Sequence, residues 1–198
     1  GGCLLDPEGE LEAGEDLVAV VADGLGGHDA GEAASVAVVA AVGALLGGLA
    51  SRVDPGDEGG LREELHEPLA GIDRLLAATA RSRGQEAGMA TTLTAAWFSG
   101  DRIVVLHLGD SRLYRLRRGR LDALTVDDTE VGYAVAAGKL TGEEARKARA
   151  GKGLKRVMGA GAENFEYGFS SLPVEEGDWY LLCSDGLTDG LDNRQIES

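Results

Sequence analysis

A change of hydrophobic spacing near the middle of the chain constrains the fold more than any other feature of the sequence. Before it, apolar residues recur at helical spacing through 30–50 and again through 61–81. After it, the stretch ATTLTAAWFSGDRIVVLHLGDSRLYRLRRGRLDAL (90–124) reads as three β-runs joined by turns. Helices inserted into a meandering set of antiparallel strands predict an α+β fold, with helices layered on sheets.

Local signals place the ends of several elements. Turns are expected at 99–101, at 109–110 and near Gly119, where glycine, serine and aspartate interrupt the β-runs. We expect Asp29 to cap the first helix and Pro68 to kink or interrupt the second. Further elements are expected as strands at 17–22, 165–172 and 179–184, and as a short helix at 142–150.

Composition and charge exclude several classes of function. The chain has 198 residues, enough for one domain, and its 19 basic and 34 acidic residues give a net charge of −15. Nucleic acid and anionic membranes would be repelled, and a phosphorylated substrate requires a bound cation that reverses the local field. The two cysteines are expected to be reduced, and the apolar run 33–50 is judged too weak to span a bilayer. These features predict a cytoplasmic protein without nucleic-acid partners or membrane insertion.

Five arginines lie close together in SRLYRLRRGR, residues 111–120. They are interpreted either as a solvated strand edge or as a docking surface for an acidic partner.

Three carboxylates end or turn predicted strands: Asp23 in VVADG, Asp110 in LGDSR and Asp185 in LCSDG. Each one alone is an ordinary turn signal. Two of them follow hydrophobic strands that we expect to be neighbours, so the carboxylates could converge at one sheet edge. Oxygen ligands of this kind suit Mg²⁺ or Mn²⁺. The glycines at 24, 26 and 27 would let the backbone approach such ions closely.

Other reactive side chains fit structural roles better than catalytic ones. His107 lies within a predicted strand and Cys183 has the apolar neighbours Leu181 and Leu182, so both are expected to be packed in the core. For His28, a catalytic role and a capping or turn role both remain open.

Five ordered stretches of the chain resemble motifs of the metal-dependent Ser/Thr protein phosphatases of type 2C, in their compact bacterial form. They are VADGLGGHDAGEAAS, GMATTLTAA (with Ala90 where glycine is usual), LGDSRLYRL, LTVDDTEVGYAVAAGKLTGEEA and LLCSDGLTDGL. The resemblance implies a four-layer α/β/β/α sandwich, with two central antiparallel sheets flanked by helices. It also implies a cleft between the sheets that holds two Mn²⁺ or Mg²⁺ ions, with a looser position for a third.

The resemblance assigns roles to particular residues. Asp23 would bridge two metals, Gly24 would offer its carbonyl to one, Asp185 would bind the other, and Asp110 would lie near the third position. The implied reaction is hydrolysis of phosphoserine or phosphothreonine in proteins by a metal-bridging hydroxide, which makes Asp23 and Asp185 the catalytic residues. Eukaryotic relatives carry a histidine at the position of Leu25, so here the leaving group would be protonated by a metal-bound water or another group.

The chain also departs from the family pattern at its ends. Residues 1–198 are interpreted as one catalytic domain lacking the family's N-terminal and C-terminal strands, with a flap segment at 127–155. No arginine precedes Asp23 to hold a substrate phosphate. Asp192-Asn193 lies where a helix is expected to begin, whereas the family places an Asp-Asn ligand further downstream. We therefore expect this chain to be a weaker catalyst than one extended at both ends.

The leading interpretation is an active phosphatase, a monomer whose partners are phosphorylated proteins that Ser/Thr kinases produce. The alternative is a catalytically weak or inactive domain of the same fold that binds a phosphoprotein or a regulator. A non-catalytic oligomerisation domain would explain the helix rich in alanine and glycine but not the three turn carboxylates.

Overall fold

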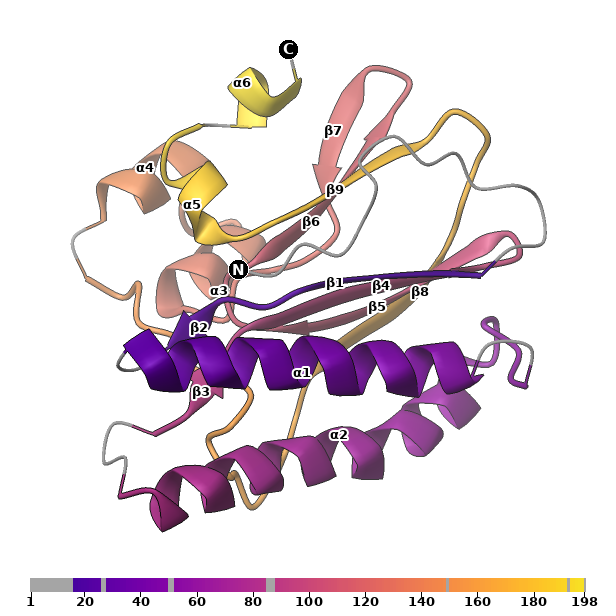
Figure 1. The fold of residues 1–198 in the computed structure, drawn as a ribbon. Coiled ribbons are helices and arrows are strands. Elements are labelled where there is room, and N and C mark those ends of the chain that lie inside the picture. The colour runs from indigo at the N-terminus through magenta and orange to yellow at the C-terminus, as the bar shows by residue number, and fades with distance from the viewer. Residues whose placement is uncertain are drawn as a thin grey trace.

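Two antiparallel sheets pack face to face, and two long helices cover one of them (Figure 1). The computed structural model describes residues 16–25, 28–49, 52–84, 88–148, 150–191 and 193–197. The four-stranded sheet has the order β1 (Leu17–Val21), β4 (Leu93–Ser99), β5 (Arg102–Leu108) and β8 (Gly168–Pro173). The three-stranded sheet has the order β7 (Arg120–Ala123), β6 (Arg112–Arg117) and β9 (Trp179–Cys183). A short pair, β2 (Gly24–Leu25) and β3 (Ala90–Thr91), follows the end of β1.

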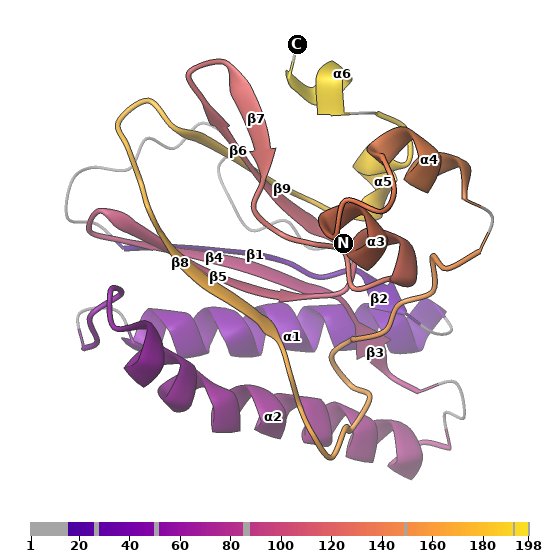
Figure 2. The same ribbon diagram turned by 180° about the vertical axis from the view of Figure 1, so that it is seen from behind.

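Helices α1 (His28–Leu49) and α2 (Glu58–Ser82) form the layer that covers the four-stranded sheet. The short helices α3 (Glu130–Ala136), α4 (Gly142–Lys147) and α5 (Asp185–Thr188) gather at the end of the sandwich where β1 and β9 finish (Figure 2). Helix α6 (Asn193–Glu197) lies against β7. The predicted α+β sandwich is confirmed. Among the described residues, the long helices belong to one outer layer, and the other sheet is accompanied only by short ones.

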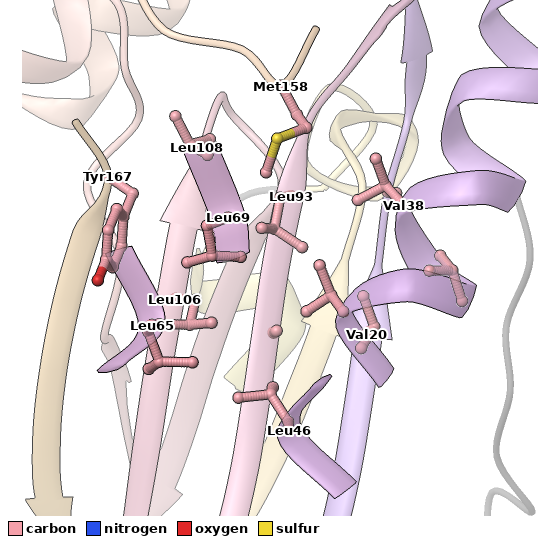
Figure 3. Packing of buried hydrophobic residues seen from close by; sticks show 14 of the residues in the cluster. Val20, Val38, Leu46, Leu65, Leu69, Leu93, Leu106, Leu108, Met158 and Tyr167 are labelled. Atoms are coloured by element: carbon pink, nitrogen blue, oxygen red, sulfur yellow. The ribbon is translucent and has the colours of Figure 1, made fainter. Parts of the chain in front are cut away.

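The main core lies between the helices and the four-stranded sheet. Leucines of both helices, among them Leu46, Leu65 and Leu69, meet Leu93 and Leu106 of the central strands, and all five are fully buried (Figure 3). A second, smaller apolar cluster lies between the sheets, where the rings of Phe98 of β4 and Tyr180 of β9 pack in a T-shaped arrangement with centroids 4.9 Å apart. The buried leucines of α2 therefore lie at the helical spacing that the sequence predicted for 61–81, whereas Leu75 of the same run is exposed.

The helix boundaries differ from those expected. Helix α1 begins at His28, so Asp29 lies in its first turn and is not the cap. Helix α2 begins three residues before the expected 61, because the Asp57 side chain accepts a 3.0 Å hydrogen bond from the Gly60 amide as the N-cap. The helix continues through Pro68 without interruption. Tertiary packing of Leu65 and Leu69 on either side of the proline supports this turn.

The apolar run in helix α1 is longer and more apolar than the sequence reading judged. By length and composition, 29–49 could cross a membrane, which the sequence reading had excluded for 33–50. In the fold, its buried side faces the four-stranded sheet and contributes Ala34, Val38, Val42 and Leu46 to the core. Packing in the sandwich thus accounts for the apolar character of this side of the helix.

The turn at 109–110 is not a hairpin, although the β-run pattern suggested one. Strand β5 belongs to the four-stranded sheet and β6 to the three-stranded sheet, so the chain crosses between sheets at Gly109-Asp110. Gly109 has a φ of +106°, and its missing side chain leaves room for the Thr92 methyl group. The other two turns are hairpins, joining β4 to β5 and β6 to β7.

The five arginines of 111–120 are held by carboxylates of this chain. Arg112 pairs with Asp127, Arg115 and Arg120 with Asp122, Arg117 with Glu175 and Asp178, and Arg118 with Glu175. The interpretation as a solvated strand edge therefore fits better than a docking surface for an acidic partner.

Candidate active site

The strand directions bring the three predicted carboxylates to one end of the sandwich. Strand β4 is antiparallel to both β1 and β5, so β1 and β5 run the same way and finish at the same end. Asp23 follows β1 and Asp110 follows β5 at that end, while Asp185 follows β9 of the facing sheet. Strand β9 finishes at the same end of the sandwich as β1 (Figure 1). The carboxylates therefore converge across the two sheets, not at the edge of one sheet as the sequence reading proposed.

Hydrogen bonds to its main chain hold Asp23 in place. Its amide donates a 2.8 Å hydrogen bond to Thr92 Oγ1, and its carbonyl oxygen accepts from the Thr92 amide at 2.9 Å and from Thr91 Oγ1 at 2.8 Å. Thr92 Oγ1 also lies 2.8 Å from Ser111 Oγ, the residue after Asp110. Both threonines and Ser111 are buried. A buried set of hydroxyls thus fixes the main chain at Asp23 relative to the 109–111 crossover.

Gly24 is required by packing against α1. A side chain at this position would place its Cβ 2.1 Å from the carbonyl oxygen of Gly31. The sequence reading had explained this glycine by close approach to a metal, and the contact with Gly31 supplies a sufficient steric reason. Gly26 and Gly27 lie outside the described residues. The proposed role of the Gly24 carbonyl as a metal ligand stays a prediction.

Asp185 begins α5, directly after β9. Burial raises the pKa of its carboxyl, and the Asp23 carboxyl, close enough to share a hydrogen bond with it, raises the pKa further. Two carboxyl groups in such contact favour sharing a proton or a cation, because their charges otherwise repel.

Asp110 lies in the same negative field. Burial raises the pKa of its carboxyl to about 6, with further contributions from the charges of Asp185, Asp127 and Asp23. Asp127 itself is tied to Arg112, whose Nε and Nη2 each donate a 2.7 Å hydrogen bond to its carboxylate. The Arg112 guanidinium is thus already paired with a carboxylate.

The oxygen donors fit a hard divalent cation. Across the described ranges, no three His, Cys, Asp or Glu side chains are gathered tightly enough to surround one ion. Asp23 and Asp185 supply two neighbouring carboxylates, and Mg²⁺ commonly binds through one or two carboxylates while keeping several waters. The donor chemistry and the excess negative charge therefore fit Mg²⁺ or Mn²⁺ at this pair.

The remaining predicted residues have structural roles or lie outside the described residues. His107 is buried; its Nε2 lies 3.0 Å from the Val126 carbonyl oxygen and its Nδ1 lies 3.0 Å from Thr94 Oγ1. Cys183 is buried and burial raises the pKa of its thiol, which confirms that it is packed. Leu25 is half-buried in β2. The side chain of His28 lies outside the described residues.

The sequence reading missed the residues that support the carboxylates. Thr91 and Thr92 occur in the quoted motif GMATTLTAA, but only the structure shows that they bind the Asp23 backbone. Asp127 and Asp128 are an adjacent acidic pair just before a helix, and a sequence signal for them was therefore present. The flap segment that they begin contains α3 and α4, which bury no side chain. That 127–155 acts as a flap stays a prediction.

Comparisons with known proteins agree with this arrangement. The family described as Protein phosphatase 2C matches residues 9–197. Serine/threonine protein phosphatase PstP of Mycobacterium tuberculosis is 39% identical over 190 residues, which cover 96% of this chain but 35% of PstP. The chain thus spans about a third of the length of that relative. Serine/threonine phosphatase stp of Listeria welshimeri is 31% identical, with coverage of 91% and 70%. The crystal structure of the PstP catalytic domain in complex with two manganese ions has a TM-score of 0.73 and 34% identity, and covers 99% of this chain and 81% of that one.

Proposed function

Because this chain belongs to the protein phosphatase 2C family, we propose that it hydrolyses phosphoserine and phosphothreonine in proteins with divalent cations as cofactors. The observation that carries the proposal is the convergence of Asp23, Asp110 and Asp185 at one end of the sandwich, from strands of facing sheets. The effect of the Asp23 charge on the pKa of Asp185 supports it. The PstP catalytic domain, 34% identical, is described with two manganese ions, which supports Mn²⁺ or Mg²⁺ as the cofactor.

The chain's own residues would hold and orient the reacting groups. Asp23 and Asp185 would bind two cations between them, the Gly24 carbonyl would bind one of these, and Asp110 would serve a looser third position. When bound, the cations supply Lewis acidity that activates water and offsets charge on the phosphoryl group. Asp23 is prepared for this role because Thr91 and Thr92 fix its main chain before any ligand arrives.

Protonation of the departing serine or threonine oxygen is proposed to come from a metal-bound water or from a group other than Leu25 and His107. Leu25 occupies the position where relatives are implied to carry a histidine, and its side chain has no proton to give. His107 is buried with both ring nitrogens occupied by Val126 and Thr94, so it is not available to a substrate.

The substrates are proposed to be phosphorylated proteins that Ser/Thr kinases produce. We also propose that the domain acts as a monomer in the cytoplasm, without nucleic-acid partners and without insertion in a membrane. The net charge of −15 supports the first exclusion, since it would repel nucleic acid. The same charge makes a bound cation necessary for an anionic phosphopeptide to approach.

The test is Mn²⁺-dependent release of phosphate from a phosphothreonine peptide and from p-nitrophenyl phosphate. We expect turnover with Mn²⁺, none with a chelator, and none for Asp23→Asn. Asp101→Asn is the matched control, because Asp101 is an exposed carboxylate in the β4–β5 turn at the opposite end of the sandwich. Turnover by Asp23→Asn at the wild-type rate would contradict the proposal.

The same assay separates the alternatives. Phosphopeptide binding without turnover by the 198-residue chain would favour an inactive binding domain. A chain extended at both termini, assayed in parallel, tests the expectation that additional terminal residues raise the activity.

A further inference from the structure

Asp128 is a fully buried carboxylate that the proposed mechanism does not use. It accepts hydrogen bonds from the Gly109 amide at 2.9 Å, from the Tyr133 hydroxyl at 2.9 Å and from Arg156 Nη2. A buried carboxylate is unfavourable unless such donors and a cation compensate its lost hydration. These three donors come from separate parts of the chain, so the Asp128 carboxylate joins Gly109, α3 and Arg156.

On the side of the candidate active site, Asp128 holds Gly109 by both of its backbone polar groups. Besides accepting from the Gly109 amide, Asp128 donates its own amide to the Gly109 carbonyl oxygen at 2.7 Å. The third side of Gly109 is closed by the Thr92 methyl carbon, which lies 2.6 Å from the position of an added Cβ. The peptide that leads into Asp110 therefore has little freedom to move.

On the other side, Asp128 holds the two ends of the flap segment together. Its carbonyl oxygen accepts from the Lys155 amide at 2.7 Å, and its carboxylate binds Tyr133 of α3 and Arg156 just beyond the segment. The Val131 amide adds a 3.1 Å bond to the Gly151 carbonyl. Hydrogen bonds thus join residues 127–131 to residues 151–156, and we call these two stretches the neck. The helices between them, α3 and α4, bury no side chain.

We propose that Asp128 is a positioning residue: its buried carboxylate fixes the peptide that presents Asp110 and couples that peptide to the neck of the flap segment. The inference rests on the proposed function, because it assigns Asp128 a part in holding the cation that Asp110 would bind. Residues that orient a metal ligand in this way commonly change metal affinity by about 10–100-fold when they are substituted.

Two variants of Asp128 separate positioning from simple loss of structure. Asp128→Ala removes every bond of the carboxylate, whereas Asp128→Asn keeps an oxygen that can accept from the Gly109 amide. Asp178→Asn is the matched control, because it breaks another buried carboxylate–arginine pair, with Arg117, in the region of the three-stranded sheet.

The first measurement is amide hydrogen exchange in the metal-free proteins. We expect Asp128→Ala to release the Gly109 amide and the Val131 amide of the neck. Asp128→Asn should keep Gly109 protected, and Asp178→Asn should change neither amide. Equal protection of Gly109 in Asp128→Ala and wild type would overturn the proposal, whether or not the protein binds a metal.

The second measurement is Mn²⁺ affinity, from the free-ion signal in electron paramagnetic resonance. We expect the weakest bound Mn²⁺ to lose about tenfold or more in affinity in Asp128→Ala, and to be largely restored in Asp128→Asn. If wild type binds no Mn²⁺, the proposed function fails. The exchange result then decides by itself whether the Asp128 carboxylate holds the Gly109 peptide. If wild type binds Mn²⁺ and Asp128→Ala binds it equally well, Asp128 does not position the site.

Discussion

The four-stranded sheet and the three-stranded sheet are stabilised in different ways, and their tryptophans show it. Trp97 of β4 is fully buried beneath α1 and α2, whereas Trp179 of β9 is 73% exposed. The first sheet belongs to a broad apolar core. The second carries arginines that are paired with carboxylates, among them Arg117 with Asp178. Apolar burial therefore dominates on one side of the sandwich and ion pairing contributes more on the other.

This difference bears on the candidate active site, because Asp23 and Asp110 follow strands of the first sheet and Asp185 follows a strand of the second. Asp23 follows the apolar sheet and is held by the buried hydroxyls of Thr91 and Thr92. Asp185 follows β9, and its helix α5 has no side-chain cap and buries no side chain. The two halves should therefore respond differently to mutation and to pH, with Asp23 on the more firmly held half.

The largest effect is expected in the apolar core. Leu65→Ala should lower the free energy of unfolding by about 2–5 kcal/mol, because it leaves a cavity beneath a fully buried position of α2. Urea denaturation followed by circular dichroism measures this change. Leu75→Ala on the same helix is the control, since Leu75 is 67% exposed and its loss should cost less than about 0.5 kcal/mol. Equal costs for the two variants would mean that α2 does not pack as described.

A smaller effect, confined to acid, is expected in the three-stranded sheet. Hydrogen bonds from Arg117 hold the pKa of Asp178 well below its usual range. Because the folded pKa is depressed, this stabilisation is complete above the unfolded value of about 3.9 and is lost as the pH falls below it. Asp178→Asn should therefore lower the urea midpoint at pH 7 and show a shallower further loss between pH 4 and pH 2. Parallel curves for wild type and variant would contradict the ion-pair account.

The smallest effect is expected from His107 of β5, whose titration should make the stability of the four-stranded sheet depend on pH. Burial lowers its pKa, partly opposed by the charge of Asp128 and the hydrogen bond to Val126. The folded state therefore favours the neutral imidazole. As the pH drops below about 6.5, the pKa of histidine in the unfolded chain, protonation favours the unfolded state and the stability should fall. Asp110, with a raised pKa of about 6, acts in the opposite sense, so the difference between His107→Gln and wild type is the quantity to measure. A constant difference from pH 7.5 to pH 5 would contradict the prediction.

Much of the fold followed from the sequence because periodicity reports which face of an element is buried. The two long helices, the strands near 17–22 and 179–184 and the β-runs within 90–124 were predicted, and membership of the protein phosphatase 2C family is confirmed over residues 9–197. The crossing at Gly109-Asp110 was not predicted, because a Gly-Asp turn looks the same whether the next strand pairs locally or joins another sheet. Sheet membership is a long-range property that local spacing does not report.

The candidate site was predicted in part. Strand ends identified Asp23, Asp110 and Asp185 as carboxylates that could meet, and the raised pKa of Asp110 places all three in one electrostatic field. The supporting contacts of Thr92 and Asp128 join residues 69 and 19 positions apart, so no local pattern could show them. The reason for Gly24 also lies in a tertiary contact, with Gly31 of α1.

The most direct test of the central claim is a double-mutant cycle on Mn²⁺ affinity, measured by isothermal titration calorimetry for wild type, Asp23→Asn, Asp185→Asn and the double variant. If the two carboxylates form one site across the sheets, each single variant should lose most of the Mn²⁺ binding, and the double variant should lose little more. Losses that simply add, or single variants that bind Mn²⁺ as wild type does, would contradict a shared site.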